Sequence, residues 1–139
     1  MDGRGIAAAL TLGAAAAQMG TAFLTTEEAG ISEGYKLAIL QARETDTRVT
    51  RAFSGRPARG IANRFMNEVE ARGLGANLGY PTQNAFTRPL RTEAARRDRP
   101  EFLSLWAGQG VRLARRGPAS SLVEQLVNET RAALNDVKV

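Results

Sequence analysis

The chain has 139 residues, of which 43% are hydrophobic, 24% charged and 6% aromatic. This composition is that of a globular protein and excludes the collagen-like, disordered and membrane-spanning classes. The chain has no cysteine and no histidine, which excludes disulfides, thiolate chemistry, the common zinc sites and a histidine general base. Any catalysis must therefore draw on a cofactor or on a further polypeptide.

The net charge of +5 is distributed unevenly. The stretch from Arg48 to Arg116 holds fourteen arginines and five acidic residues, a net charge of +9, and the remainder carries −4. Because 17 of the 19 basic residues are arginine, a genomic arginine bias accounts for this as well as selection for phosphate binding does. The longest apolar run, residues 6–24, is interrupted by Gly13, Gln18 and Gly20, so we expect no signal peptide, no membrane partner and a cytoplasmic location.

The N-terminal pattern predicts one helix, followed by a segment with two interpretations. Asp2 can cap a helix whose apolar face holds Ile6, Ala7 and Leu10, with Gly13 ending it. Residues 14–17 favour helix by propensity, whereas the sequence of residues 15–21 also fits a strand leading into a turn. A strand needs a partner, and the chain offers no convincing one, which indicates that a pairing element is missing.

The middle of the chain predicts two helices separated by an extended segment. Ser32 caps the first helix, whose apolar stripe consists of Tyr35, Ala38, Ile39 and Ala42. Residues 48–53 can be extended, and residues 54–57 form a turn by composition. A second helix is expected from Ala58, with an exposed Arg64–Glu68 pair and a stripe of Ile61, Phe65 and Val69.

Glycine and proline divide the last part of the chain. Breaks are expected at Gly73, Gly75, Gly79 and Pro81, followed by a helix from Thr82 that Pro89 interrupts. Ser121 and Glu124 form a capping box for a terminal helix with five inward residues, namely Leu122, Val123, Leu126, Val127 and Leu134. The chain is thus expected to be predominantly helical.

Several blocks of sequence carry a family resemblance. They are residues 2–10, 18–24 (QMGTAFL), 35–36 (YK), 44–47 (ETDT), 52–60 (AFSGRPARG), 63–65 (NRF), 80–85 (YPTQNA), 87–90 (TRPL) and 105–110 (LWAGQG). Across essentially the whole chain, and in the same order, they resemble the nitronate monooxygenase family, formerly called 2-nitropropane dioxygenases.

The resemblance implies an α/β fold, namely an FMN-binding TIM barrel with an added mainly helical domain, of which this chain is the C-terminal portion. A closed barrel needs roughly 200 residues or more, so we expect a C-terminal fragment holding the last βα units. The implied domains are the end of the (β/α)8 barrel at 1–47 (helix 7, strand 8 and the following helix), a helical insertion at 48–117 and a C-terminal helix at 118–139.

The same resemblance implies the cofactor-binding residues Gln18, Met19, Gly20, Thr21 and Gln109. Gly20 allows close approach of a phosphate and a positive φ, while Thr21 offers an N–H and a hydroxyl. Ala22 departs from the family pattern, which has arginine there. The catalytic histidine of the family lies in its N-terminal portion, so no catalytic residue is expected in this chain, nor any metal ligand.

The implied activity is FMN-dependent oxidation of alkyl nitronates by dioxygen to a carbonyl compound and nitrite. The fragment alone is expected to be inactive without the missing N-terminal barrel portion as a partner. One alternative is a fragment similar to FMN-dependent enoyl-acyl-carrier-protein reductase. The other, a basic nucleic-acid-binding module, is disfavoured because the aromatic residues have the helical spacing of core residues.

Overall fold

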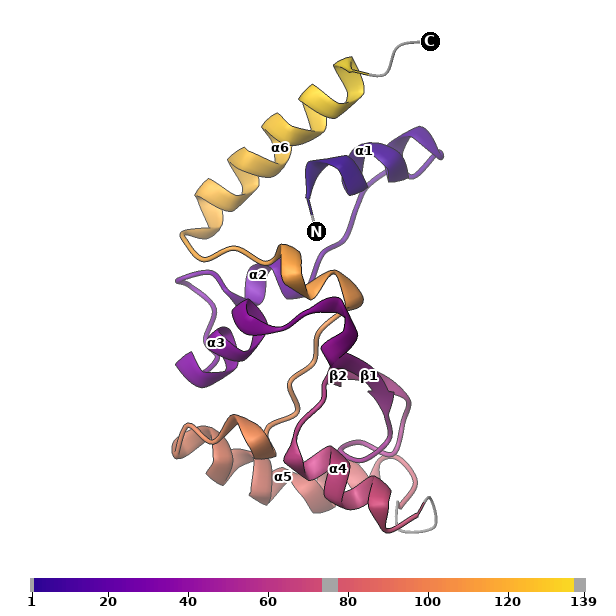
Figure 1. Cartoon of the computed structure of the whole chain (residues 1–139), viewed down its shortest axis with the longest axis vertical. Coiled ribbons are helices and arrows are strands. Elements are labelled where there is room, and N and C mark those ends of the chain that lie inside the picture. The colour runs from indigo at the N-terminus through magenta and orange to yellow at the C-terminus, as the bar shows by residue number, and fades with distance from the viewer. Residues whose placement is uncertain (1, 74–77, 137–139) are drawn as a thin grey trace. The chain divides into compact units, whose positions relative to one another are not determined.

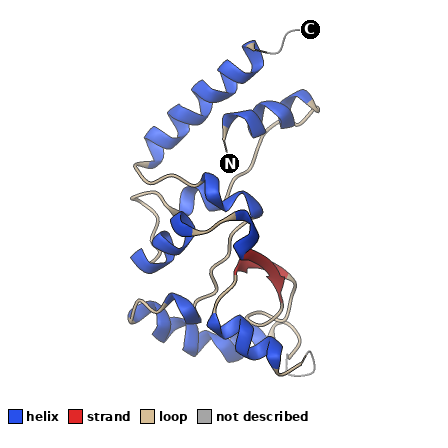
Figure 2. Cartoon of the chain, in the orientation of Figure 1, coloured by secondary structure: helices blue, strands red, loops and turns tan. Residues whose placement is uncertain are grey.

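The computed structural model describes residues 2–73 and 78–136, which form two compact units (Figure 1). The terminal unit combines residues 1–30 with 113–139, and the central unit comprises Ile31–Arg112. Each unit is described by itself. The described chain is mostly helical, with one two-stranded sheet (Figure 2), which agrees with the expected predominance of helix.

The terminal unit contains α1 (Gly3–Thr11), α2 (Thr21–Leu24) and α6 (Ala119–Asn135). As predicted, Asp2 caps α1, its carboxylate accepting from the Gly5 N–H at 3.0 Å. The Gly3 N–H donates to the Glu129 carboxylate at 2.9 Å, so α1 is joined to α6 at its first residue. An apolar cluster of Ala22 from α2 with Leu122 and Leu126 from α6 forms the core of this unit, and Met19 and Phe23 pack against it.

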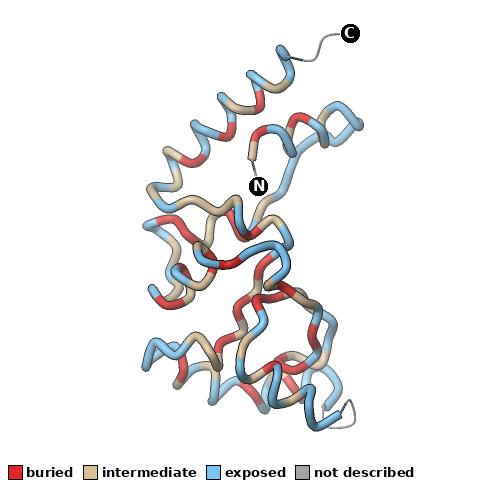
Figure 3. The backbone as a smooth tube through the Cα atoms, viewed as in Figure 1, coloured by how far each residue is buried: buried red, intermediate tan, exposed pale blue. Residues whose placement is uncertain are grey.

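The residues between α1 and α2 form neither of the two elements considered. Residues 14–20 contain no helix and no strand, and residues 21–24 are a short helix where a strand or turn was expected. Residues 14–18 are exposed, the stretch drawn pale blue between the two helices in Figure 3. Residues 14–20 form no strand for the reason given in the sequence analysis, namely that a strand requires a partner backbone with which to form hydrogen bonds.

The predicted capping box of α6 is wrong. The helix begins at Ala119, two residues before Ser121, and its first N–H donates to the Glu28 carboxylate at 2.9 Å. A carboxylate from a distant loop thus satisfies the N-terminus, which a local sequence pattern does not reveal. Leu122 and Leu126 are buried as predicted, whereas the other three residues of the expected inward set, Val123, Val127 and Leu134, are exposed.

The central unit begins with α3 (Glu33–Gln41), which Ser32 caps as predicted, and a short 3-10 turn, η1 (Glu44–Asp46). Strands β1 (Thr47–Thr50) and β2 (Ala58–Ile61) then pair antiparallel, with Thr47 opposite Ile61 and Thr50 opposite Ala58. The predicted turn connects them, and Gly55 takes the positive φ (+82°) that it needs.

The helix expected from Ala58 starts only at α4 (Arg64–Ala71), capped by Asn63. Residues 58–61 are drawn into the hairpin because β1 offers them backbone partners, and Gly60 weakens their helical alternative. The Arg64–Glu68 pair forms as predicted, at 2.6 Å. Phe53, packed on Phe65 and on Trp106 at ring-centroid distances of 4.8 and 5.7 Å, centres the core of this unit.

Helix α5 (Thr82–Arg96) contradicts the predicted interruption at Pro89, since it continues through that residue. Buried Gln83 and Thr87 hold it before the proline, donating to the carbonyls of Ala52 and Phe53, each at 2.6 Å. Beyond the proline, buried Ala94 packs inward. Because Pro89 is exposed, water can satisfy the carbonyl that its missing N–H leaves without a partner.

Two further 3-10 helices, η3 (Pro100–Phe102) and η4 (Gln109–Leu113), are the remaining elements of the described residues. The predicted break at Gly75 lies outside the described residues. The contacts divide the chain at residues 30/31 and 112/113, whereas the expected domain boundaries at 47/48 and 117/118 refer to a larger protein and stay a prediction.

Candidate cofactor-binding site

Gly20 and Thr21 lie where residues 14–20 enter α2. Gly20 is exposed and has a φ of −98° and a ψ of −62°, so the positive φ that glycine permits is not used here. Nothing lies within 4 Å of the position where a Cβ at Gly20 would project. Because Gly20 has no side chain and borders open space, its backbone is accessible to a ligand from this side. Thr21 is 9% exposed.

A set of hydrogen bonds holds this loop against residues 115–117 of the same unit. Thr25 is fully buried, and its hydroxyl donates to the Arg115 carbonyl at 2.7 Å. The Glu27 N–H donates to the Gly117 carbonyl at 3.1 Å, next to a bridge between Thr26 and Gly117. The position of α2, and with it that of Gly20 and Thr21, is thus fixed by residues almost a hundred positions away.

Gln18 and Met19 occupy different surroundings. The Met19 side chain packs against the apolar cluster that contains Ala22 and Leu126, whereas Gln18 is exposed. A Met19 contact with a cofactor on the exposed side would consequently come from its backbone, and the Gln18 contact from its side chain.

Gln109 opens η4 in the central unit and is exposed. The structure thus brings residues 18–21 together in one unit and describes Gln109 separately in the other. Nearby in sequence, the Trp106 carbonyl accepts from the Tyr35 hydroxyl at 2.8 Å. Burial raises the pKa of Tyr35 above its usual range, so this phenol stays protonated and serves as a hydrogen-bond donor.

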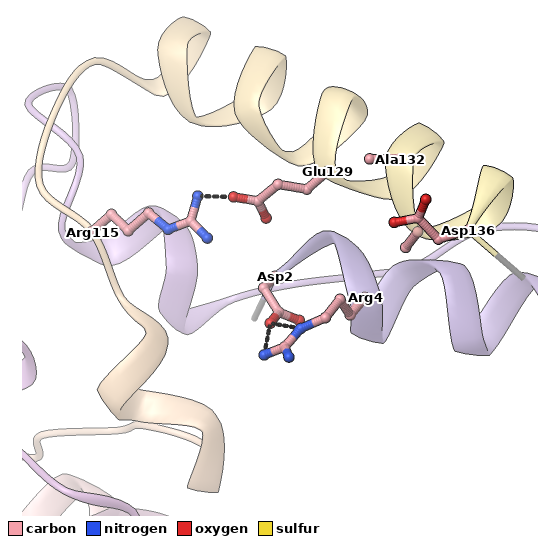
Figure 4. A pocket seen from close by; sticks show the side chains of 7 residues that line it. Asp2, Arg4, Arg115, Glu129, Ala132 and Asp136 are labelled. Carbon is pink, nitrogen blue, oxygen red and sulfur yellow. Dashed lines mark hydrogen bonds and ion pairs between the residues drawn. The ribbon is translucent and has the colours of Figure 1, made fainter.

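The sequence did not reveal a charged cavity of about 670 Å³ in the terminal unit (Figure 4). Arg115 and Glu129 form an ion pair on one side of it, and Arg4 pairs with Asp2 at 3.0 Å on the other. In the sequence, only the charged residues that line this cavity indicate it, because α1 and α6 lie far apart in the chain. The Arg115–Glu129 pair connects the segment before α6 to α6, and the hydrogen bond from the Gly3 N–H to Glu129 connects α6 to α1, which is a structural role.

Over residues 2–73 and 78–136 no group of three or more acidic side chains is placed to hold a metal ion. Within the same ranges no helix is long and apolar enough to cross a membrane.

Comparison with known proteins gives consistent results. The family model described as nitronate monooxygenase matches residues 1–129. A probable nitronate monooxygenase of Staphylococcus saprophyticus is 46% identical over 138 residues, which cover 97% of this chain and 38% of that protein. One from Staphylococcus aureus is 46% identical over 93% of this chain and 36% of its own length.

Two solved structures are also similar. The nitroalkane oxidase of Streptomyces ansochromogenes superimposes with a TM-score of 0.91 at 46% identity, over 99% of this chain and 39% of its own. FabK from Thermotoga maritima gives a TM-score of 0.79 at 31% identity, over 96% of this chain and 42% of its own. The chain thus spans about two-fifths of the length of the proteins that it matches. Since the family model covers nearly all of it, the chain belongs to the nitronate monooxygenase family.

Proposed function

We propose that this chain is the C-terminal portion of an FMN-dependent enzyme that oxidises alkyl nitronates by dioxygen to a carbonyl compound and nitrite. The family match over residues 1–129 carries the proposal. It is supported by the names of the relatives, nitronate monooxygenase and nitroalkane oxidase. The barrel architecture and the cytoplasmic location expected from the sequence stay predictions.

The residues around Gly20 suit a phosphate chemically. Thr21 supplies a hydroxyl and a backbone N–H, and the open space beside Gly20 lets an anion reach the backbone. Exposed Gln18 offers an amide to the flavin, Met19 its backbone, and Gln109 a second amide from the central unit. FMN, when bound, supplies the electron transfer, and these residues bind and orient it.

The chain lacks one essential part of the activity. This chain has no histidine, so it cannot supply the family's catalytic base. We assign that base to the remaining three-fifths of the relatives, which this chain does not span. The chain alone is therefore inactive, and the remaining polypeptide is its required partner.

The decisive experiment joins this chain to the remaining part of the Staphylococcus saprophyticus relative and measures bound FMN per folded protein. Gly20→Val should lower FMN occupancy at least tenfold, because the side chain would fill the space that the phosphate needs. Since that space is open, the fold tolerates the change. Gly30→Val is the matched control, with equally open surroundings in the same unit.

Thr21→Ala should have an intermediate effect of about 1 kcal/mol, because it removes the hydroxyl and keeps the N–H. Oxygen consumption with the 2-nitropropane anion, measured beside reduction of an enoyl thioester, separates the proposed reaction from the reductase alternative. Unchanged FMN occupancy and oxygen consumption in Gly20→Val would show that the phosphate binds elsewhere.

A further inference from the structure

Residues 105–107, which lead to Gln109, lie along β2 in the central unit. An antiparallel bridge pairs Trp106 with Gly60. Two backbone hydrogen bonds flank this bridge, from the Ile61 N–H to the Leu105 carbonyl at 2.9 Å and from the Ala107 N–H to the Arg59 carbonyl at 3.2 Å. The segment before Gln109 is thus fixed to β2 along one of its edges.

Gly60 allows this segment to come so close to β2. A Cβ at Gly60 would lie 2.8 Å from the Leu105 carbonyl oxygen and 3.2 Å from the Trp106 ring. The first separation is shorter than van der Waals contact allows, so any side chain at this position would push residues 105–107 away. The glycine therefore keeps the backbone before Gln109 against β2.

The opposite edge of the segment is held by Tyr35. In an antiparallel pair, the residues that do not exchange hydrogen bonds direct their own N–H and C=O away from the partner strand. Trp106 is such a residue, because its two neighbours make the bonds to β2, and its carbonyl accepts from the Tyr35 hydroxyl at 2.8 Å. The peptide between Trp106 and Ala107 is therefore held at both its carbonyl and its N–H, two residues before Gln109.

Tyr35 is itself placed by contacts at both ends of its surroundings. Ser32 caps α3 at the turn that carries Tyr35, and the neighbouring Gly34 N–H donates to the Asp98 carboxylate at 2.9 Å. Because Asp98 follows the end of α5, the first turn of α3 is fixed to that helix. The Tyr35 hydroxyl thus reaches the Trp106 carbonyl from a rigid support.

The backbone is also anchored after Gln109. Val111 is fully buried, and the Arg112 guanidinium pairs with the Glu44 carboxylate at 3.2 Å. The Gln109 side chain, in contrast, is exposed, and its amide forms no hydrogen bond with any residue in the described ranges. The central unit therefore presents one uncommitted amide from a backbone that is held on both sides. Such preorganisation lets an amide bind a ligand without the entropic cost of first ordering the backbone.

We propose that Tyr35 is a positioning residue of the flavin site, whose hydroxyl acts through the Trp106 carbonyl to fix the backbone that presents the Gln109 amide. The proposal rests on the proposed function in one respect, that Gln109 contacts the bound flavin. It adds a residue that touches neither the cofactor nor the substrate and yet sets how tightly the cofactor binds.

The test uses this chain joined to the remaining part of the Staphylococcus saprophyticus relative. Tyr35→Phe removes the hydroxyl and keeps the ring, and Gln109→Ala removes the amide. The two variants and their combination form a double-mutant cycle for the dissociation constant of FMN. We expect each single variant to raise this constant at least fivefold. The double variant should raise it less than twofold beyond the larger single effect, because Tyr35 then has no amide to position.

A second measurement follows the anchoring without the cofactor. Hydrogen exchange at the Ala107 amide in the FMN-free protein should accelerate at least tenfold in Tyr35→Phe. Thr87→Val is the matched control, because it removes another hydroxyl that donates to a backbone carbonyl in the same unit, that of Phe53 at 2.6 Å. This control should lose stability while changing both the FMN dissociation constant and the Ala107 exchange less than twofold.

Independent effects of Tyr35→Phe and Gln109→Ala, whose fold-changes multiply in the double variant, would overturn the proposal, since they would leave Tyr35 a purely structural role. So would unchanged Ala107 exchange in Tyr35→Phe, an effect no larger than that of Thr87→Val, or unchanged FMN binding in Gln109→Ala. A fusion that shows the expected coupling but consumes no oxygen with a nitronate would contradict the proposed reaction and leave the role of Tyr35 intact.

Discussion

At Gly3 the absence of a side chain sets how closely α1 approaches α6. A Cβ there would collide with the Cβ of Glu129 and the backbone of Thr130. Gly3→Ala must therefore push the helices apart and break the Gly3–Glu129 hydrogen bond. We expect a loss of about 2–4 kcal/mol in unfolding free energy, as for overpacking with a lost hydrogen bond.

Gly5→Ala is the matched control on the same helix. A Cβ at Gly5 would lie 3.6 Å from the Asp2 carboxylate, which is an ordinary van der Waals contact. The gain in helix propensity should leave that variant as stable as the parent or slightly more so. Chemical denaturation measures both. Equal stability of the two variants would show that α1 and α6 are not in close contact in solution.

The Thr25 hydroxyl is the second single group with a large expected effect. Thr25→Val keeps the side-chain volume but removes the donor to the Arg115 carbonyl, which costs about 1–3 kcal/mol when that acceptor stays buried. Thr130→Val is the control, because its hydroxyl bonds only the Leu126 carbonyl four residues earlier in α6. Amide exchange in α2 should accelerate in Thr25→Val alone; similar exchange in both variants would contradict the anchoring role.

At the scale of elements, carboxylates bind α1 to its surroundings. The Arg115 guanidinium, then the Gly3 N–H, lowers the pKa of Glu129, and the Gly5 N–H, then Arg4, lowers that of Asp2. A lowered folded pKa stabilises the protein fully above the carboxyl's ordinary pKa of about 4, and this stabilisation is lost as the pH falls through the folded value.

Acidification from pH 7 to pH 3 should therefore destabilise the α1–α6 packing. Glu129→Gln should cost about 1 kcal/mol at pH 7, a modest value because the side chain is 35% exposed. The same substitution should reduce the difference in stability between pH 7 and pH 3. Thermal unfolding of both proteins across this range measures the effect, and identical pH profiles would refute it.

Helices with local signals could be predicted from the sequence. Asp2 and Ser32 cap their helices as expected, and the turn at residues 54–57 lies where its composition places it. Elements that depend on distant partners could not be predicted. Residues 58–61 become a strand because of β1, α6 begins early because of Glu28, and α5 passes Pro89 because Gln83 and Thr87 anchor it.

The candidate site shows the same division. Its residues were predicted from the resemblance, but the helical backbone of Gly20 was not, because it depends on the start of α2 at this point. Which residues between α1 and α2 turn inward also depends on packing. Met19 turns inward only because α6 supplies an apolar cluster, and α6 is separated from it by a hundred residues.

At the scale of the whole molecule, we expect this chain to bind the cofactor weakly, because it spans only about two-fifths of the length of its relatives. The proposed phosphate loop, without the rest of a flavin pocket, would make only part of the contacts and would still bear the full entropic cost of association. Flavin-fluorescence titration of the isolated chain should therefore show a dissociation constant in the millimolar range or no binding. Tight stoichiometric binding would mean that this chain alone contains the essential contacts.

The arginine-rich middle of the chain also has a testable consequence. Of the fourteen arginines from Arg48 to Arg116, at least seven pair with carboxylates, for example Arg64 with Glu68 and Arg112 with Glu44. Phe53, Phe65 and Trp106 pack on one another in the core and offer no stacking platform for bases, whereas Tyr80 and Phe86 are exposed, contrary to the expected core position. We expect only weak, sequence-independent binding of polyanions that disappears near physiological salt.

Mobility shifts with two DNA duplexes of unrelated sequence, at about 50 and 150 mM salt, measure this binding. Binding of one duplex in preference to the other at the higher salt would contradict the expectation and favour the nucleic-acid alternative.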